Sequence, residues 1–337
     1  MGDILHALPA VTALRAEHPD WYIGWAVEPR WRPLLCAETK ARDDGRGPAM
    51  PLIDCLHRVH AKAWGKSPLS LRTLRQIAGV RRDLRAGHYD VCVDLQGAVR
   101  SAWIGRWARP QRMIGEEHPR EAAARWLFRE RVKTTGTHVI EQALEVTNAV
   151  AGDDLRFQPP ELPFDAAAKA WCDALEIGRK PLVLLNPGAG WGAKRWPAER
   201  YGAVAAAMAA RGFEVLVNAG PAERGLADAM VEASGGASRR IDPTLGQLIE
   251  MTRRASLMIA GDTGPLHLAC ALRKPVVGIF GPTDPARNGP FGCDFRVLRH
   301  PESKRDHSRR AEPEAGLLTI TAEDVLQAAD ALLGERI

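Results

Sequence analysis

The sequence lacks several features that would assign it quickly. No stretch approaches the roughly 18 uninterrupted apolar residues of a membrane span, and the N-terminus lacks the charged and then apolar segment of a signal peptide, so we expect a cytoplasmic protein. The six cysteines form no Cys-x-x-Cys pair and no zinc-type spacing with His, which predicts reduced, mostly buried thiols. A Walker loop and a G-x-G-x-x-G turn are also missing, which argues against ATPases and dehydrogenases.

Length and charge are more informative. The 337 residues are more than one hydrophobic core usually organises, so two domains are expected. Segment 57–112 holds twelve Lys and Arg residues against three Asp residues, and it should attract anions. It is either a solvated basic helix face or a docking face for an acidic acceptor or an anionic membrane leaflet. We expect no nucleic-acid partner, because no DNA- or RNA-binding motif accompanies the charge.

Short apolar runs alternate with longer stretches of helical period, which predicts an α/β fold with parallel sheets. An acidic, Pro-rich passage at 152–163 separates an expected domain 1–160 from a second domain 161–337. The basic stretch 296–310 is expected to be an exposed loop. Strands are expected at 21–27, 89–94, 112–115, 182–185, 214–218, 257–260 and 276–280, and helices at 10–17, 69–85, 100–108, 138–150 and 322–333.

The turn after the strand at 257–260 carries the clearest chemistry of the second half. Asp262 ends the strand, and either Asp262 or Thr263 can cap the following helix. Gly264 lets backbone N–H groups approach a ligand, which makes an anion site at a helix N-terminus. His267 lies about one turn further on. The alternative is a merely structural cap, with His267 hydrogen-bonded inside the protein.

Two other turns follow strands of the second half, at the edge where open parallel sheets bind ligands. The turn 186–190 begins with Asn186 and contains Gly188, and Lys194 comes just after it. Flexible glycines beside a cation suit a diphosphate. The turn 218–223 offers Glu223 to ribose hydroxyls, by analogy with acidic residues of other nucleotide folds.

The first half offers an acid and several polar side chains. Asp3 lies next to Gly2 at the start of a helix, where it is a candidate N-cap or a candidate general base. Gln96 follows the strand at 89–94 and should lie at the ligand-binding edge of its sheet. No metal site is expected, and the structural or acceptor-binding role is favoured over metal ligation for His6, His118 and His138.

Five ordered segments together resemble the heptosyltransferases of glycosyltransferase family 9, most closely the type I enzymes of lipopolysaccharide inner-core synthesis. The segments are MGDILHALPAV at 1–11, DLQGAVRSA at 94–102, NPGAGWGAKRWP at 186–197, GDTGPLHLACAL at 261–272 and FGPTDP at 280–285. Because they are spread in order over nearly the whole chain, the set is far more specific than any one member.

The resemblance implies a GT-B fold, in which two Rossmann-like domains face a cleft. The first domain would bind the acceptor through His6, Gln96 and His138, with Asp3 as the catalytic base. The second would bind a nucleotide sugar, with Lys194 neutralising the departing diphosphate. The residues implied in donor binding are Asn186, Gly188, Lys194, Glu223, Asp262, Thr263, Gly264 and His267.

The implied reaction is metal-independent and cofactor-free, and it transfers heptose with inversion. Its donor is ADP-L-glycero-D-manno-heptose and its acceptor is Kdo-lipid A, an anionic glycolipid of the inner membrane. The basic segment 57–112 fits that partner and a peripheral position at the cytoplasmic face of this membrane.

One departure from the family pattern concerns the first strand. Family members usually begin with a strand of roughly eight to twelve residues before the Gly-Asp turn, whereas this sequence starts at the Met before that turn. The first core strand is therefore expected to be missing, and a start codon assigned too late is the favoured reason.

Three other functions stay open at this stage. Another family 9 transferase, such as a heptosyltransferase II-like enzyme, shares the same motifs. A sugar-nucleotide epimerase of the GT-B fold would bind a nucleotide sugar without a lipid acceptor. A non-catalytic protein that binds nucleotide sugars or anionic glycolipids would show neither transfer nor donor hydrolysis.

Overall fold

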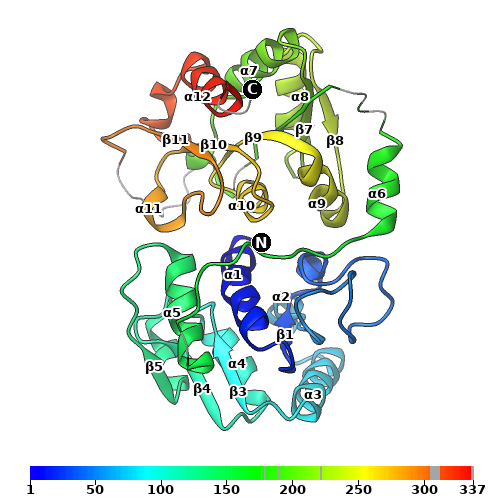
Figure 1. Cartoon of the computed structure of the whole chain (residues 1–337), viewed down its shortest axis with the longest axis vertical. Coiled ribbons are helices and arrows are strands. Elements are labelled where there is room, and N and C mark those ends of the chain that lie inside the picture. Colours follow the sequence, from blue (N-terminus) through cyan, green and yellow to red (C-terminus); the bar gives the residue numbers. More distant parts are fainter. Residues whose placement is uncertain are drawn as a thin grey trace. The chain divides into compact units, whose positions relative to one another are not determined.

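The computed structural model of the protein describes residues 1–152, 154–175, 177, 180–188, 190–220, 222–303 and 312–334. The chain divides into two compact units, Asp3–Asp165 and Ala166–Ile337, where the sequence predicted a division after residue 160. Both units combine helices with parallel strands (Figure 1), so the expected α/β class is confirmed. In the part of the chain that the structure describes, no helix has the length and apolar character needed to cross a membrane.

The second unit is built on a six-stranded sheet in the order β11-β10-β9-β6-β7-β8, with every neighbouring pair parallel. Every residue of β6 and β10 is buried, because helices cover both faces of a sheet of this kind. The strands are β6 (Leu182–Asn186), β7 (Glu214–Asn218), β8 (Arg239–Ile241), β9 (Ala255–Gly261), β10 (Val276–Phe280) and β11 (Phe295–Arg299).

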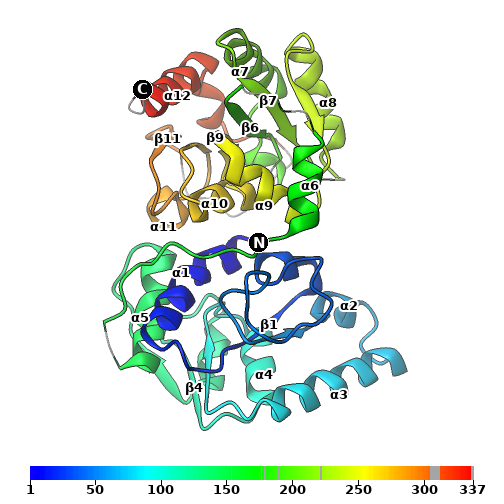
Figure 2. The same ribbon diagram turned by 45° about the vertical axis from the view of Figure 1, so that its right-hand side comes forward.

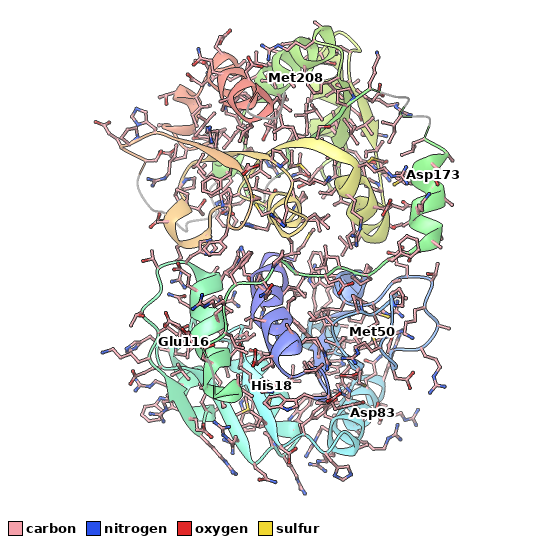
Figure 3. The ribbon with its side chains drawn as sticks, viewed as in Figure 1. His18, Met50, Asp83, Glu116, Asp173 and Met208 are labelled. Atoms are coloured by element: carbon pink, nitrogen blue, oxygen red, sulfur yellow. The ribbon has the colours of Figure 1, made fainter. Side chains whose placement is uncertain are left out.

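Two apolar cores lie on the two faces of this sheet. One is formed with α7 (Ala198–Ala210), α8 (Arg224–Ala233) and α12 (Ala322–Gly334), and Met208 of α7, labelled in Figure 3, is fully buried in it. The other is formed with α6 (Ala166–Asp173), α9 (Leu245–Arg254) and α10 (Gly264–Ala271). Shorter helical segments are η3 (Gly192–Lys194), α11 (Pro285–Asn288) and η4 (Leu317–Thr319).

The first unit has two smaller parallel sheets among its described residues. Strands β1 (Gly24–Val27) and β2 (Cys55–Arg58) form one, and β3 (Val91–Asp94), β4 (Arg112–Glu116) and β5 (Glu130–Val132) form the other in that order. The helices are α1 (Gly2–Glu17), η1 (Pro29–Leu34), α2 (Ala61–Lys66), α3 (Leu71–Ala86), α4 (Val99–Trp107), η2 (Ala122–Leu127) and α5 (Val139–Ala151).

The prediction of an exposed loop at 296–310 was wrong at its start. Residues 295–299 form β11, which pairs in parallel with β10. The arginines of this strand hid its apolar pair, Val297 and Leu298, which pack against the two cores of the unit. Arg299 Nε donates to the carbonyl of Gly281 at 3.2 Å. Residues 304–310 of the predicted loop lie outside the described residues.

Candidate functional site

The order of strands in the second unit marks where a ligand should bind. From β6 the chain adds β7 and β8 on one side, and it then adds β9, β10 and β11 on the other side. The order therefore reverses between the neighbouring strands β6 and β9. Open parallel sheets bind ligands outside the carboxyl ends of their strands at such a reversal. Asn186 ends β6, and Asp262 directly follows β9, so the predicted residues belong to this point of the sheet.

Three predicted side chains form one charged cluster after these strands. The Lys194 ammonium pairs with Asp262 Oδ2, and His267 Nε2 lies 3.2 Å from Asp262 Oδ1. The Lys194 and Asp262 side chains are each only 10% exposed. Lys194 Nζ also lies 4.3 Å from the ring centroid of Trp191, in cation–π geometry. A nearly buried cation is therefore held in place before any ligand arrives.

The electrostatics of this cluster favour the charged carboxylate. Burial opposes ionisation of Asp262, but contacts with His267 and Lys194 outweigh it and lower the pKa of Asp262 well below its ordinary value. Asp262 therefore stays ionised and fixes both neighbours. The Lys194 ammonium is thus held in a fixed position by a carboxylate that stays charged.

The lowered pKa of Asp262 predicts a pH-dependent contribution to stability. A carboxyl group whose folded pKa is depressed stabilises the fold above its unfolded pKa, and this stabilisation is lost as pH falls below that value. We expect the difference in unfolding free energy between wild type and Asp262→Asn to be constant above about pH 5 and to shrink below the ordinary Asp value of 3.8, by at most about 1.4 kcal/mol per pH unit.

Urea unfolding of both proteins at a series of pH values measures this difference. Asp90→Asn, which changes an exposed carboxylate, is the matched control. A wild-type-to-Asp262→Asn difference that stays constant down to pH 3 would contradict the assignment.

Asn186 connects neighbouring turns of the second unit, and donor binding by Asn186 stays a prediction. Its side chain is buried, and Nδ2 lies 3.4 Å from the Gly188 carbonyl and 3.5 Å from Thr263 Oγ1. Its Oδ1 accepts a 2.6 Å hydrogen bond from Asn218 Nδ2 at the end of β7. The amide therefore connects the turns after β6, β7 and β9, which makes Asn186 a positioning residue in this structure.

The start of α10 has no side-chain cap. Thr263 occupies the N-cap position, but its side chain makes no capping hydrogen bond. Its hydroxyl donates instead to the Gly261 carbonyl at 3.2 Å. The Thr263 side chain therefore does not cap the helix, whereas His267 is buried and hydrogen-bonded to Asp262, as the structural alternative expected. The first turn begins at Gly264, where backbone N–H groups attract anions.

Gly188 and Glu223 come together from different turns. A Cβ atom added at Gly188 would lie 2.1 Å from Glu223 Oε1, so the carboxylate rests directly against the glycine backbone. Glu223 Oε2 also accepts a hydrogen bond of 3.2 Å from the Gly220 N–H. The structure therefore brings together the turns after β6 and β7, which the sequence analysis treated separately.

In the first unit, Asp3 lies in the first turn of α1 and not at its N-cap, which is Met1. Asp3 Oδ2 accepts a hydrogen bond of 3.3 Å from Gln96 Nε2 and lies 3.2 Å from Arg120 Nη1. The Asp3 side chain is 55% exposed. An oriented and accessible carboxylate of this kind is suited to take a proton from a bound hydroxyl.

Arg120 is a site residue that the sequence reasoning missed. Gly97 adopts φ +65°, and a Cβ there would lie 2.9 Å from the Arg120 backbone nitrogen, so only glycine lets the two loops approach. The buried Asp94 carboxylate fixes this turn by accepting from the Gln96 and Gly97 N–H groups, at 2.8 and 2.9 Å. Burial raises the pKa of Asp94 in spite of these bonds. No local motif around Arg120 signals this contact.

The predicted histidines separate into two groups. His6 and His138 pack edge to face, with ring centroids 5.9 Å apart. His138 is the N-cap of α5: its Nδ1 accepts from the Ile140 N–H at 3.2 Å, and its own N–H donates to Glu141. His138 therefore has a structural role, and acceptor binding by His6 and His138 stays a prediction. His118 is exposed.

Two further polar groups belong to the loops after β6 and β10. Trp191 Nε1 and Thr283 Oγ1 are buried and have no hydrogen-bond partner among the described residues. Trp191 lies in segment 186–197 and Thr283 in segment 280–285, and both segments contributed to the family resemblance. That resemblance is the sequence signal that could have pointed to these two residues. Within the same described part of the chain, no group of three or more His, Cys, Asp or Glu side chains is arranged to hold a metal ion.

Known proteins are similar to this chain over most of its length. The chain is 28% identical to lipopolysaccharide heptosyltransferase 1 of Pseudomonas aeruginosa in an alignment that covers 87% of this chain and 79% of that protein. It is 25% identical to lipopolysaccharide heptosyltransferase 3 of Escherichia coli in an alignment that covers 99% of this chain and 96% of that protein.

A solved structure and a family model complete the comparison. The structure of the E. coli heptosyltransferase WaaC with ADP superposes with a TM-score of 0.77 at 24% identity, over 98% of this chain and 97% of that one, which confirms the GT-B fold. The sequence model described as glycosyltransferase family 9 (heptosyltransferase) matches residues 77–317. That match covers well over half of the chain, and the protein therefore belongs to glycosyltransferase family 9, the heptosyltransferases.

Proposed function

We propose that the protein transfers heptose from ADP-L-glycero-D-manno-heptose to Kdo-lipid A, with inversion at the anomeric carbon and without a metal ion. The observation that carries the proposal is the Lys194–Asp262–His267 cluster at the strand reversal of the second unit. The related WaaC structure contains ADP, which supports an ADP-sugar donor. The chain is similar to both type 1 and type 3 heptosyltransferases, so these similarities do not select one type. The type I assignment therefore rests on the motif set.

In the proposed reaction the second unit handles the leaving group. As the bond between the anomeric carbon and the phosphate oxygen breaks, its electron pair leaves with ADP and negative charge grows on the diphosphate. Lys194 supplies the opposing charge in a nearly buried position, where electrostatic interactions are stronger than in water. The uncapped start of α10 adds N–H groups, and Asp262 keeps Lys194 and His267 in position.

The first unit supplies the base. The Asp3 carboxylate takes the proton of the acceptor hydroxyl, while the hydroxyl oxygen forms the new bond to the anomeric carbon. Gln96 and Arg120 fix the orientation of Asp3. We assign Arg120 a second role as partner of an acceptor carboxylate, because its guanidinium is 53% exposed and matches planar anions.

Arg120 therefore should control acceptor binding more than donor binding. We expect Arg120→Ala to raise the acceptor KM by about tenfold to a hundredfold, the loss typical of one charge-assisted hydrogen bond. The donor KM should stay within about twofold. Steady-state kinetics with each substrate varied in turn tests this, and the neighbouring Arg125→Ala is the matched arginine control. Equal changes in the two KM values would contradict the role.

Gly188 should matter through Glu223. In Gly188→Ala the added Cβ displaces the flexible Glu223 side chain without disturbing backbone, so the fold should survive. If Glu223 binds the ribose hydroxyls, we expect ADP affinity to fall by about tenfold in Gly188→Ala and in Glu223→Gln alike. Calorimetric titration with ADP measures it. Gly190→Ala, where a Cβ meets open space, should bind as wild type, and an unchanged affinity in Gly188→Ala would exclude this contact.

The decisive experiment follows ADP release and acceptor mass with ADP-heptose and Kdo-lipid A. Release that requires the acceptor and adds one heptose supports the proposal. Transfer to an acceptor that already carries heptose would point to another family 9 specificity. Change of the sugar without any acceptor would indicate an epimerase, and ADP-heptose binding without turnover would indicate a binding protein.

A further inference from the structure

Three leucines are exposed together where α2 leads into α3. Leu69 is 87% exposed, Leu71 is 72% exposed and Leu74 is 49% exposed. Leu69 precedes the N-cap Ser70, and the other two lie in the first turn of α3. These exposed leucines are close neighbours in the sequence. A cluster of exposed apolar side chains commonly marks an interaction surface. Figure 2 shows α3 at the edge of the first unit, next to α2.

The folding of α3 accounts for this exposure. Ile77, Val80 and Leu84 lie on one side of the helix and pack into a core with Trp64 of α2 and Ile104 of α4. With 3.6 residues per turn, position 71 falls on the opposite side, together with Arg75 and Arg82. The outward side is therefore apolar at its N-terminal end and cationic along the rest.

Exposed cations flank the leucines along the chain. Lys62 and Lys66 of α2 and Arg72 and Arg75 of α3 are all exposed. None of Lys66, Arg72 and Arg75 pairs with an acidic side chain among the described residues. Asp83, labelled in Figure 3, is the acid of α3, and it pairs with Arg82. Exposed leucines next to cations without acidic partners complement a surface with anionic groups outside and hydrocarbon beneath.

We propose that this corner, defined by Lys62, Lys66, Leu69, Leu71, Arg72, Leu74 and Arg75 and here called the leucine corner, inserts its leucines into an anionic phospholipid bilayer. The leucines enter the acyl boundary, and the four cations bind lipid phosphates. A folded protein partner is disfavoured, because interfaces usually deplete lysine, whereas interfacial membrane segments use Lys and Arg beside Leu. The inference rests on the proposed function in one respect: an acceptor embedded in a membrane is the reason for the enzyme to bind that membrane.

The test compares vesicle binding of the whole protein in three forms. These are wild type, the variant Leu69→Gln/Leu71→Gln/Leu74→Gln, and the matched control Leu318→Gln, which changes an exposed leucine of the second unit. Binding is measured by co-sedimentation with vesicles of phosphatidylethanolamine and phosphatidylglycerol, and with vesicles of phosphatidylcholine alone. A fourth form, Leu71→Trp, reports insertion depth through quenching by brominated acyl chains, measured as the difference from wild type.

Wild type and Leu318→Gln should bind the anionic vesicles equally, and the triple variant at least about tenfold more weakly. Lys66→Gln and Arg72→Gln should each weaken binding by about fivefold. The tryptophan introduced by Leu71→Trp should be quenched by bromine in the acyl chains. The proposal would be overturned by any one of three results. These are no binding of wild type to anionic vesicles, wild-type binding by the triple variant, or no quenching of the introduced tryptophan.

Activity separates this inference from the proposed function. With a water-soluble, deacylated acceptor, the triple variant should turn over as wild type, whereas with acceptor embedded in vesicles its rate should fall with its binding. If no acceptor is glycosylated, the proposed function fails, and the vesicle measurements still decide the leucine corner. Loss of activity with the soluble acceptor as well would show a disturbed fold, which circular dichroism would detect.

Discussion

Lys194→Ala is expected to lower kcat by about a hundredfold to a thousandfold, the range found when one preorganised transition-state donor is removed. Lys194 is only 10% exposed, and its ammonium contacts both Asp262 and the Trp191 ring. The donor KM should change less than kcat, because the charge on the diphosphate grows mainly as the glycosidic bond breaks.

The neighbouring residue provides the control for this experiment. Arg195 has the same charge and belongs to the same loop, but it is exposed. Arg195→Ala should therefore keep kcat within about threefold of wild type, as expected for a screened surface charge. A thermal unfolding scan should accompany both, because Lys194→Ala leaves Asp262 with a single partner. If Arg195→Ala and Lys194→Ala lose the same activity, the specific role of Lys194 is wrong.

Asp3→Asn is expected to reduce kcat by about a hundredfold to ten-thousandfold, the usual contribution of a general base. The amide keeps the shape of the carboxylate but does not accept the proton. ADP affinity should remain unchanged, because the groups proposed to hold ADP belong to the second unit. Rapid-quench measurement of a single turnover gives the chemical step directly, and calorimetry gives ADP affinity.

The stability of Asp3→Asn should stay near that of wild type. Asp3 and Arg120 are both more than half exposed, and such surface pairs contribute little to the free energy of unfolding. Glu17→Gln, at the other end of α1, is the matched control and should keep full activity. An Asp3→Asn enzyme with normal single-turnover rate would remove Asp3 from the mechanism.

The sequence predicted the second unit well for a physical reason. Buried parallel strands are continuous apolar runs, and their carboxyl ends meet at one edge of the sheet. Lys194 and Asp262 could therefore be placed near each other although they are 68 residues apart. The short strands β2, β5 and β8 carry no such run and were not predicted. β11 was hidden by its arginines.

The contacts of Arg120 and Asn186 could not be predicted in the same way. Arg120 reaches Asp3 because Gly97 permits a close approach of two loops, and that depends on tertiary packing, not on a local pattern. Asn186 was placed at the ligand-binding edge because it ends a strand, but no local pattern predicted that its amide connects three turns. His138 and Glu141 form a capping box at the start of α5. This local pattern indicates a structural role for His138, in addition to the expected acceptor binding.

The paired amides of Asn186 and Asn218 also limit how this enzyme could be redesigned. Because they connect the turns after β6, β7 and β9, those turns are not independent modules that can be exchanged one at a time. A turn grafted from a relative with another sugar preference would have to bring a compatible partner for the buried amide or leave it unsatisfied. Under the proposed donor-binding role, the three turns would have to be exchanged together.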